Sequence, residues 1–316
     1  MTDVAPPSSA PVPPAAAVNP ARWVVLLRAM RPHQWVKNTF VLAPLLFAGP
    51  ELLRRGELDA DVVVRVGLAI LAFCLGSSAT YLLNDLHDVQ ADRAHPVKRL
   101  RPIAAGALPI NQAWAAFAVL LVAALTLALA VGAQVAAIQG GYFAMNVAYS
   151  RGLKRIAYVD AVVISCGFLL RALAGGEAAR VHLSAWLIAC TVLLALFLAL
   201  GKRKHELMTS DAEHRAALEH YRIEHLNFAL GVLAALAAGA YALYARDPAT
   251  IARFGTDRLL FTLPFALFGL WRFYQLLDDH TTAQSPTERM LRDPIFLGNG
   301  LLGGIAVVLV IYGVAR

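Results

Sequence analysis

Cysteine and charge are both scarce in this chain. Its three cysteines, Cys74, Cys166 and Cys190, show no metal-binding spacing and fall inside apolar runs, which argues against a zinc site and a disulfide framework. They are expected to be small packing residues. Charged residues make up 16% of the chain and hydrophobic residues 59%, a balance far from that of soluble domains. The composition therefore predicts a polytopic membrane protein.

The sequence also lacks the features that predict a signal peptide or a second folded domain. The first residues have no basic segment leading into an apolar core, so they do not predict a signal peptide. Residues 1–21 are rich in Pro, Ala and Ser, which predicts a disordered tail. We find no internal repeat, and no polar block is long enough for another folded domain. Residues 22–316 are therefore expected to form one transmembrane domain.

Nine apolar runs are near or above the length that a helix needs to cross a bilayer. The sequence thus predicts an all-α bundle of about nine transmembrane helices. The first run is short, and the runs around Gly132 and Gly231 to Gly239 could be divided differently. The runs are residues 35–50, 62–83, 111–131, 133–149, 157–175, 183–200, 224–245, 259–277 and 295–315.

Lysine and arginine are distributed unevenly between the loops. If the tail is cytoplasmic, the loops on its side hold about twice as many of these residues as the opposite loops, as the positive-inside rule requires. The polar loop at 84–109 then faces the cytoplasm, and the net charge of +7 is mostly a topology signal. Nucleic-acid binding is not expected, because the basic residues are scattered and lack an aromatic platform.

The segment NDLHDVQADRAHPVKRLRPIAAG, residues 84–106, concentrates charge in an otherwise apolar chain. Asp85, Asp88 and Asp92 follow an i, i+3, i+7 spacing, which places them on one face if the preceding helix continues. Three like charges repel there unless a cation lies between them. Oxygen ligands without cysteine select Mg²⁺ or Mn²⁺, and Mg²⁺ keeps positions open for phosphate oxygens. We therefore predict a metal and diphosphate site formed by these aspartates and Asn84.

The same loop allows a simpler interpretation. Its acids could merely pair with the basic residues that follow them in a solvated loop. Those basic residues are Arg93, Lys98, Arg99 and Arg101. The regular register of the acids favours the metal site, and Arg101 is then a candidate for substrate binding.

Ionisable residues also occur in and beside the predicted fifth span. An ionisable group inside a span is a functional candidate, because its burial in lipid is costly. Asp160 and Arg171 are about three helical turns apart, so each needs another partner or a wet cavity. The alternative for both is an interhelical ion pair that fixes the bundle. Tyr149 and Lys154 precede this span and are further candidates for substrate binding.

Two more basic segments border the same membrane face. In GKRKHEL, after the sixth span, Lys202 and Arg203 are candidates for binding anionic oxygens, and Glu206 for an extra metal ligand or an orienting partner. The alternative is that these basic residues only satisfy the positive-inside rule. RPHQWVKN, near the first span, adds Lys37 and Asn38 to the candidates.

Together these motifs resemble the UbiA superfamily of intramembrane prenyltransferases. The resemblance rests on NDxxDxxxD after the second span, on Y-x4-K before the fifth, and on the helix count. RPHQWVKN, GFLLRALAG and GKRKHEL are most similar to its branch of decaprenyl-phosphate phosphoribosyltransferases, over residues 28–315. One departure stands out: aromatic prenyltransferases of the superfamily carry a second motif, DxxxD, where this chain has GKRKHEL with the acids Glu206, Asp211 and Glu213.

The resemblance implies a magnesium-dependent enzyme that transfers 5-phosphoribose from 5-phosphoribosyl 1-diphosphate to a polyprenyl phosphate, releasing diphosphate. The extra phosphates of both substrates suit a basic loop in place of the second acidic motif. The expected setting is the cytoplasmic face of a bacterial inner membrane, and a homo-oligomer stays open. The alternatives are an aromatic prenyltransferase acting on a quinone-type ring and a non-catalytic membrane transporter.

Overall fold

The computed structural model describes residues 21–208, 218–278 and 286–313. Residues 1–20 of the predicted tail, together with Asp211 and Glu213, lie outside this part of the chain. Within the described residues all regular secondary structure is helical, which confirms the predicted all-α class. The α-helices are α1 (Arg22–Met30), α2 (Ala43–Arg55), α3 (Ala60–His87), α4 (Val89–Ala94), α5 (Ile110–Val131), α6 (Ala133–Arg151), α7 (Val159–Ala179), α8 (Ala185–Met208), α9 (Ile223–Arg246), α10 (Pro248–Phe254), α11 (Leu263–Leu277), α12 (Pro286–Met290) and α13 (Pro294–Gly313). Tighter 3₁₀ turns form η1 (Pro32–Leu42), η2 (Lys98–Leu100), η3 (Leu153–Arg155), η5 (Leu218–His220) and η6 (Arg258–Thr262).

In the described chain, seven helical segments are long and apolar enough to cross a membrane, namely α3, α5, α7, α8, α9, η6 with α11, and α13. The predicted polytopic membrane class is therefore confirmed. The predicted count of nine spans is not.

The two remaining predicted spans do not reach the same helix length and apolar character, for different physical reasons. The run at 35–50 is divided between η1 and α2, and Pro44 at the start of α2 has no backbone N–H to continue a helical hydrogen-bond ladder. The run at 133–149 does form one helix, α6, of 19 residues. Gln134, Gln139 and Asn146 make it more polar than the other long helices.

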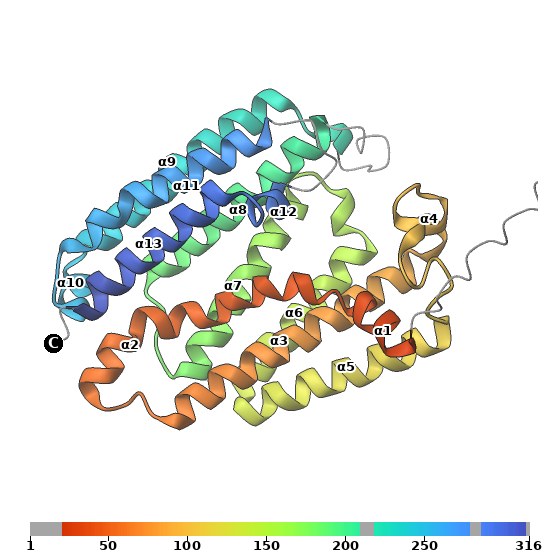
Figure 1. Cartoon of the computed structure of the whole chain (residues 1–316), viewed down its shortest axis with the longest axis horizontal. Coiled ribbons are helices and arrows are strands. Elements are labelled where there is room, and N and C mark those ends of the chain that lie inside the picture. Colours follow the sequence, from red (N-terminus) through yellow and green to blue (C-terminus); the bar gives the residue numbers. More distant parts are fainter. Residues whose placement is uncertain (1–20, 209–217, 279–285, 314–316) are drawn as a thin grey trace, which may run out of the picture.

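The helices pack as two groups with α7 between them. α7 contacts α3 and α6 on one side and α8 on the other, while α9, α11 and α13 complete the second group (Figure 1). α3 is closely surrounded because its middle carries small residues that let neighbouring helices approach. A Cβ added at Gly76 would collide with the end of the Gln139 side chain of α6, which would then have to move.

Polar segments gather at one end of the bundle. α4 and the C-terminal ends of α3 and α8 lie at this end, whereas α10 and the connection between α2 and α3 lie at the other (Figure 1). Two connections at the polar end place a non-glycine residue in the left-handed region, Arg31 with φ 54° and Tyr158 with φ 65°. Such conformations cost energy and persist where the surroundings hold them, as the contacts of both residues do here.

Candidate active site

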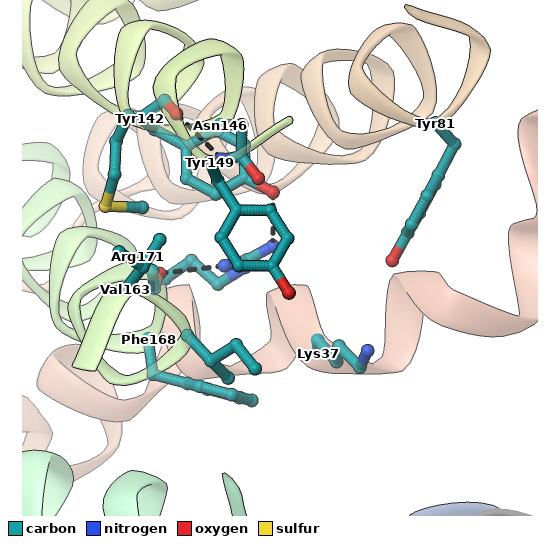
Figure 2. Close-up of a pocket in the computed structure, with 11 residues that line it drawn as sticks. Lys37, Tyr81, Tyr142, Asn146, Tyr149, Val163, Phe168 and Arg171 are labelled. Carbon is teal, nitrogen blue, oxygen red and sulfur yellow. Dashed lines mark hydrogen bonds between the residues drawn. The ribbon is translucent and has the colours of Figure 1, made fainter. Parts of the chain in front are cut away.

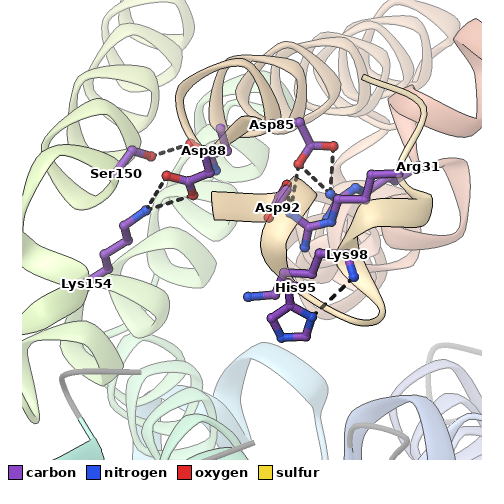
Figure 3. Close-up of polar contacts among 10 residues, drawn as sticks. Arg31, Asp85, Asp88, Asp92, His95, Lys98, Ser150 and Lys154 are labelled. Carbon is purple, nitrogen blue, oxygen red and sulfur yellow. Dashed lines mark hydrogen bonds and ion pairs between the residues drawn. The ribbon is translucent and has the colours of Figure 1, made fainter. Parts of the chain in front are cut away.

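The acidic motif lies where α3 ends. Asp85 belongs to α3, whereas Asp88 occupies the junction between α3 and α4, with φ −94° and ψ 11°. The predicted continuous helix is therefore interrupted at Asp88. As a result the carboxylates of Asp85 and Asp92 share a partner, while that of Asp88 turns toward α6 and η3 (Figure 3). We call these three aspartates the acidic cluster.

Two arginines bind one half of the acidic cluster. Nη2 of Arg31 donates to both carboxylate oxygens of Asp85, at 2.7 and 2.9 Å (Figure 3). Nη1 of Arg101 bridges Asp85 at 3.2 Å and Asp92 at 2.7 Å. Both acids are almost fully buried, with 2% and 3% of the residue exposed. The arginines thus compensate two negative charges that face the protein interior.

The other half of the motif is held from the opposite side. Nζ of Lys154, on η3, contacts the two carboxylate oxygens of Asp88 at 3.0 and 2.8 Å. The hydroxyl of Ser150, at the end of α6, donates to the side-chain oxygen of Asn84. The simpler interpretation of the loop is therefore correct in one respect, because Arg101 pairs with Asp85 and Asp92. The partners Arg31 and Lys154 come from outside the loop.

The donor set of the cluster suits a hard divalent cation. Carboxylates and an amide oxygen are the ligands that Mg²⁺ prefers. Across the described ranges no group of three His, Cys, Asp or Glu side chains is arranged as a metal site. Residues of the right type are present, but the basic partners contact the oxygens that a metal would need.

A polar pocket of about 140 Å³ adjoins the acidic cluster. Lys37 of η1, Tyr81 of α3, Tyr149 of α6 and Arg171 of α7 line it. Figure 2 shows the ammonium of Lys37 and the hydroxyls of Tyr81 and Tyr149 directed toward the same space. The guanidinium of Arg31 lies 5.0 Å from the ring centroid of Tyr81, so this ring is shared by the pocket and the cluster.

Arg171 contributes a buried positive charge to the polar pocket. It is 5% exposed, and its Nε donates to Asn38 at 2.7 Å. Nη1 donates to the carbonyl of Gly167 at 2.7 Å and Nη2 to the hydroxyl of Tyr142 at 3.0 Å. All three partners are neutral, unlike the ion pair considered as an alternative. The pocket therefore keeps an uncompensated cation in its wall, which favours an anionic ligand.

A second charged group joins the start of α7 to the end of α8. Nε of Arg203 lies 2.6 Å from the carboxylate of Asp160, with 1% and 0% of the side chains exposed. The hydroxyl of Tyr221 donates to the same carboxylate at 2.6 Å, and Nη1 of Arg203 contacts Glu206. Burial and the hydrogen bond to Asp160 raise the pKa of Tyr221 well above its usual value. Its hydroxyl stays protonated and keeps donating.

Lys202 differs from its buried neighbour Arg203. Its side chain is 38% exposed, and Nζ lies 3.7 Å from Glu206. An anion arriving from water can reach Lys202, whereas Arg203 is enclosed by its carboxylate partners.

An apolar groove of about 360 Å³ lies between α8, α9 and α11. Phe40 of η1 lines this groove and packs edge-to-face on Phe168, with ring centroids 4.8 Å apart. Phe168 in turn lines the polar pocket. The polar pocket and the apolar groove are thus neighbours that meet at one aromatic pair.

Comparison with known proteins identifies the fold. The sequence pattern of the UbiA prenyltransferase family matches residues 41–299. The chain belongs to this family. Decaprenyl-phosphate phosphoribosyltransferase of Mycolicibacterium smegmatis is 42% identical over 225 residues, 70% of each chain. The protein of that name from Corynebacterium glutamicum is 34% identical over 296 residues, 91% of this chain and 86% of its own.

Solved structures agree with the family assignment. A UbiA homologue from Archaeoglobus fulgidus, bound to GPP and Mg²⁺, superposes with a TM-score of 0.68 at 17% identity, covering 90% of this chain and 99% of its own. A structure of digeranylgeranylglyceryl phosphate synthase gives 0.60 at 17% identity, covering 92% and 95%. The UbiA resemblance predicted from the motifs is confirmed, and the chain is a UbiA-type transferase.

The predicted site residues of this UbiA protein fall into three neighbouring groups, and their individual roles stay predictions. The motif forms the first group, with Arg101 and Lys154 on its acids. Lys37, Tyr149 and Arg171 line the polar pocket, and Asn38 binds Arg171. The third group consists of Asp160, Lys202, Arg203 and Glu206.

Several residues that complete these groups are not among the predicted site residues. Arg31 carries a local signal, because it lies in RPHQWVKN at the same membrane face. The others are uncharged at neutral pH and lie in or beside apolar helices, where nothing in the local pattern distinguishes them. They are Tyr81, Tyr142, Ser150 and Tyr221.

Proposed function

We propose that this UbiA protein transfers 5-phosphoribose from 5-phosphoribosyl 1-diphosphate to a polyprenyl phosphate at the cytoplasmic membrane face. The observation that carries the proposal is that three different binding environments lie next to one another. An acidic cluster adjoins a pocket with a buried cation, and that pocket adjoins an apolar groove. A donor diphosphate, an anionic headgroup and a prenyl tail each find a matching environment in that order. The name of these relatives, decaprenyl-phosphate phosphoribosyltransferase, supports the polyprenyl phosphate acceptor and the phosphoribosyl group that is transferred.

In this proposal the acids hold the leaving diphosphate through a divalent cation. Asn84, Asp85, Asp88 and Asp92 are the proposed ligands, and Mg²⁺ or Mn²⁺ suits their oxygens. When bound, the ion would neutralise the charge that builds up on diphosphate as the bond from C1 of the ribose to oxygen breaks. Arg101 lies between two of these acids and is placed to contact the same diphosphate.

The acceptor phosphate is the proposed nucleophile. One of its oxygens forms the new bond to C1 while diphosphate leaves, so no proton has to be removed at pH 7. The site must instead bring two anions together in a productive geometry. Lys37 and Arg171 in the polar pocket, with the exposed Lys202, supply the cations for this task.

A donor assay tests the proposal directly. Purified protein in detergent is incubated with a labelled polyprenyl phosphate and 5-phosphoribosyl 1-diphosphate, or with prenyl diphosphate and an aromatic acceptor. We expect a phosphoribosylated lipid and diphosphate in the first reaction only. Product in the second reaction alone would establish the aromatic prenyltransferase alternative. Consumption of neither donor, together with ion movement in proteoliposomes, would establish the transporter.

Removal of divalent metal should abolish turnover. The acidic cluster cannot neutralise a leaving diphosphate with carboxylates alone, because both carry negative charge. We expect EDTA to stop product formation and added Mg²⁺ or Mn²⁺ to restore it, measured as labelled lipid formed over time. Restoration by Zn²⁺ alone would contradict the assignment of oxygen ligands.

Filling the apolar groove should discriminate against long acceptors. Ala238 of α9 lines the groove, so Ala238→Phe should raise the KM for a long-chain polyprenyl phosphate by about tenfold. A short-chain phosphate should be used at the wild-type rate, because its tail does not reach the groove. The matched control is Ala235→Phe, on the exposed face of the same helix, which should change neither reaction. If Ala238→Phe lowered activity equally with the long and the short acceptor, the prenyl tail would bind outside this groove.

A further inference from the structure

The acidic cluster is matched by basic side chains one for one. Arg31, Arg101 and Lys154 lie within 2.7 to 2.8 Å of Asp85, Asp92 and Asp88, respectively. Three negative charges therefore face three positive charges, and the cluster is close to neutral without a metal. A site built only to attract a divalent cation would leave its carboxylates uncompensated. The pairing therefore needs an explanation beyond metal binding.

The acids and their partners differ in how firmly they are enclosed. The side chains of Asp85 and Asp92 are 2% and 4% exposed, whereas those of Arg31 and Arg101 are 24% and 29% exposed. In the third pair Lys154 is 27% and Asp88 39% exposed, so the contrast holds for the two arginine pairs. The buried acids are fixed by packing, while the long basic side chains keep access to water. A rearrangement of this cluster would therefore move the cations and leave the buried acids in place.

The arginines contact the acids with only part of their hydrogen-bonding capacity. Arg31 binds Asp85 through Nη2, and Arg101 binds Asp85 and Asp92 through Nη1. A guanidinium has five N–H donors arranged for bidentate binding of carboxylate or phosphate. Arg31 also lies over the ring of Tyr81, a wall of the polar pocket, so its guanidinium is close to both the acids and that pocket.

The balance of charge favours release of these basic side chains from the acids only when metal and diphosphate bind together. Adding a divalent cation to a neutral cluster brings it close to three positive groups, which is unfavourable at short range. A diphosphate that enters with the metal compensates the ion and offers the basic side chains new acceptors. Metal and diphosphate should then strengthen each other's binding by the same factor, as thermodynamic linkage requires.

We propose that Arg31, Arg101 and Lys154 are exchangeable counter-ions. They occupy the carboxylates in the metal-free protein and transfer to diphosphate oxygens when metal and diphosphate bind together. The exchange positions the donor and prevents tight metal binding before the donor arrives. It rests on the proposed function only in requiring a diphosphate-bearing substrate.

The test is Mn²⁺ binding to the purified full chain, measured by electron paramagnetic resonance with and without inorganic diphosphate. For the wild type we expect weak binding that diphosphate strengthens by about tenfold or more, within the usual range for coupled sites. For Arg101→Gln we expect the difference between the two conditions to shrink. Mn²⁺ alone should bind about tenfold more tightly, because a competitor for the carboxylates is removed, and the strengthening by diphosphate should largely vanish.

Arg99→Gln is the matched control. Arg99 is exposed, lies two residues away in the same loop, and has no described contact with the acids, so this change removes the same charge without the pairing. It should behave like the wild type. Asp85→Asn should lose Mn²⁺ binding in both conditions, and thermal melting in detergent shows whether each variant is folded.

Two outcomes would overturn the exchange. Weaker binding of Mn²⁺ alone to a folded Arg101→Gln would mean that the arginine holds the acids in shape. Unchanged binding of Mn²⁺ alone, with diphosphate binding lost, would mean that it binds substrate without competing for the acids. Because neither measurement uses a ribosyl donor or a lipid, failure of the proposed reaction is detected separately by the donor assay.

Discussion

Replacement of Asp85 or Asp88 by asparagine should lower turnover at least about a hundredfold, at saturating Mg²⁺ and matched protein amounts. Asparagine keeps the volume of the side chain but removes the charge that holds a metal against the leaving diphosphate. Asp85→Asn has a second consequence, because Arg31 and Arg101 lose their buried partner. The measurement is the rate of labelled lipid formation, with thermal melting to confirm that the variants fold.

Asp61→Asn is the control on the same helix. Asp61 lies in the first turn of α3, at the opposite end from the cluster, and forms an exposed pair with Arg180. Exposed pairs contribute little to stability, so this variant should keep wild-type turnover and folding. Near-normal turnover of either cluster variant would remove that aspartate from the metal ligands.

The location of the acidic cluster could be predicted from sequence because its signal is local. Three aspartates within eight residues follow an apolar run, and helical periodicity alone places them at the end of a helix. The interruption at Asp88 could not be predicted. It turns one carboxylate toward Lys154, which is 66 residues away in the chain. Periodicity carries no information about a partner at such a distance.

The same limit applies to the buried polar residues. The need of Arg171 for a partner could be predicted from the sequence, because an ionisable group in an apolar helix is costly. Its partner Asn38 lies 133 residues earlier in the chain. This pairing could not be predicted, because many other polar side chains in the sequence could serve as the partner equally well. Arg31 and Asp85 are likewise 54 residues apart. Residues that need partners are thus predictable from sequence, whereas the pairings require the fold.

The predicted number of nine spans is not confirmed, and one reason lies in the helices themselves. Hydrophobicity detects apolar runs, but it does not detect that η1 is wound more tightly than an α-helix. The tighter winding and the turn at Arg31 place Lys37 against the polar pocket and Phe40 against the apolar groove. A first span of regular α-helix would distribute these side chains differently.

The role expected for Arg203 changes once the burial of its side chain is known. A basic residue directly after a span suits both phosphate binding and the positive-inside rule, and the sequence cannot separate the two. In the fold its guanidinium is enclosed by Asp160 and Glu206. These contacts favour a third role, in which Arg203 positions the ends of α7 and α8 relative to each other. The neighbouring Lys202 keeps the exposure that phosphate binding needs.

Arg203→Met should therefore act on stability. Removing one partner of a buried ion pair leaves an uncompensated charge, here Asp160, and costs about 3–5 kcal/mol. We expect a clear fall in the thermal midpoint of the detergent-solubilised protein. Lys202→Ala should instead leave the midpoint unchanged and lower kcat/KM by about tenfold to a hundredfold, as expected for a lost charge-assisted phosphate contact.

A second change separates a lost ion pair from lost packing. Adding Asp160→Asn to Arg203→Met removes the orphaned charge and keeps an oxygen that can accept from the hydroxyl of Tyr221. The double variant should then be more stable than Arg203→Met alone, because a buried pair replaced on both sides costs far less than a pair broken on one side. If the double variant is the less stable of the two, packing of the arginine matters more than its charge. If Arg203→Met melts like the wild type and raises only the KM for the sugar donor or the lipid phosphate, Arg203 binds substrate as its position in GKRKHEL first indicates.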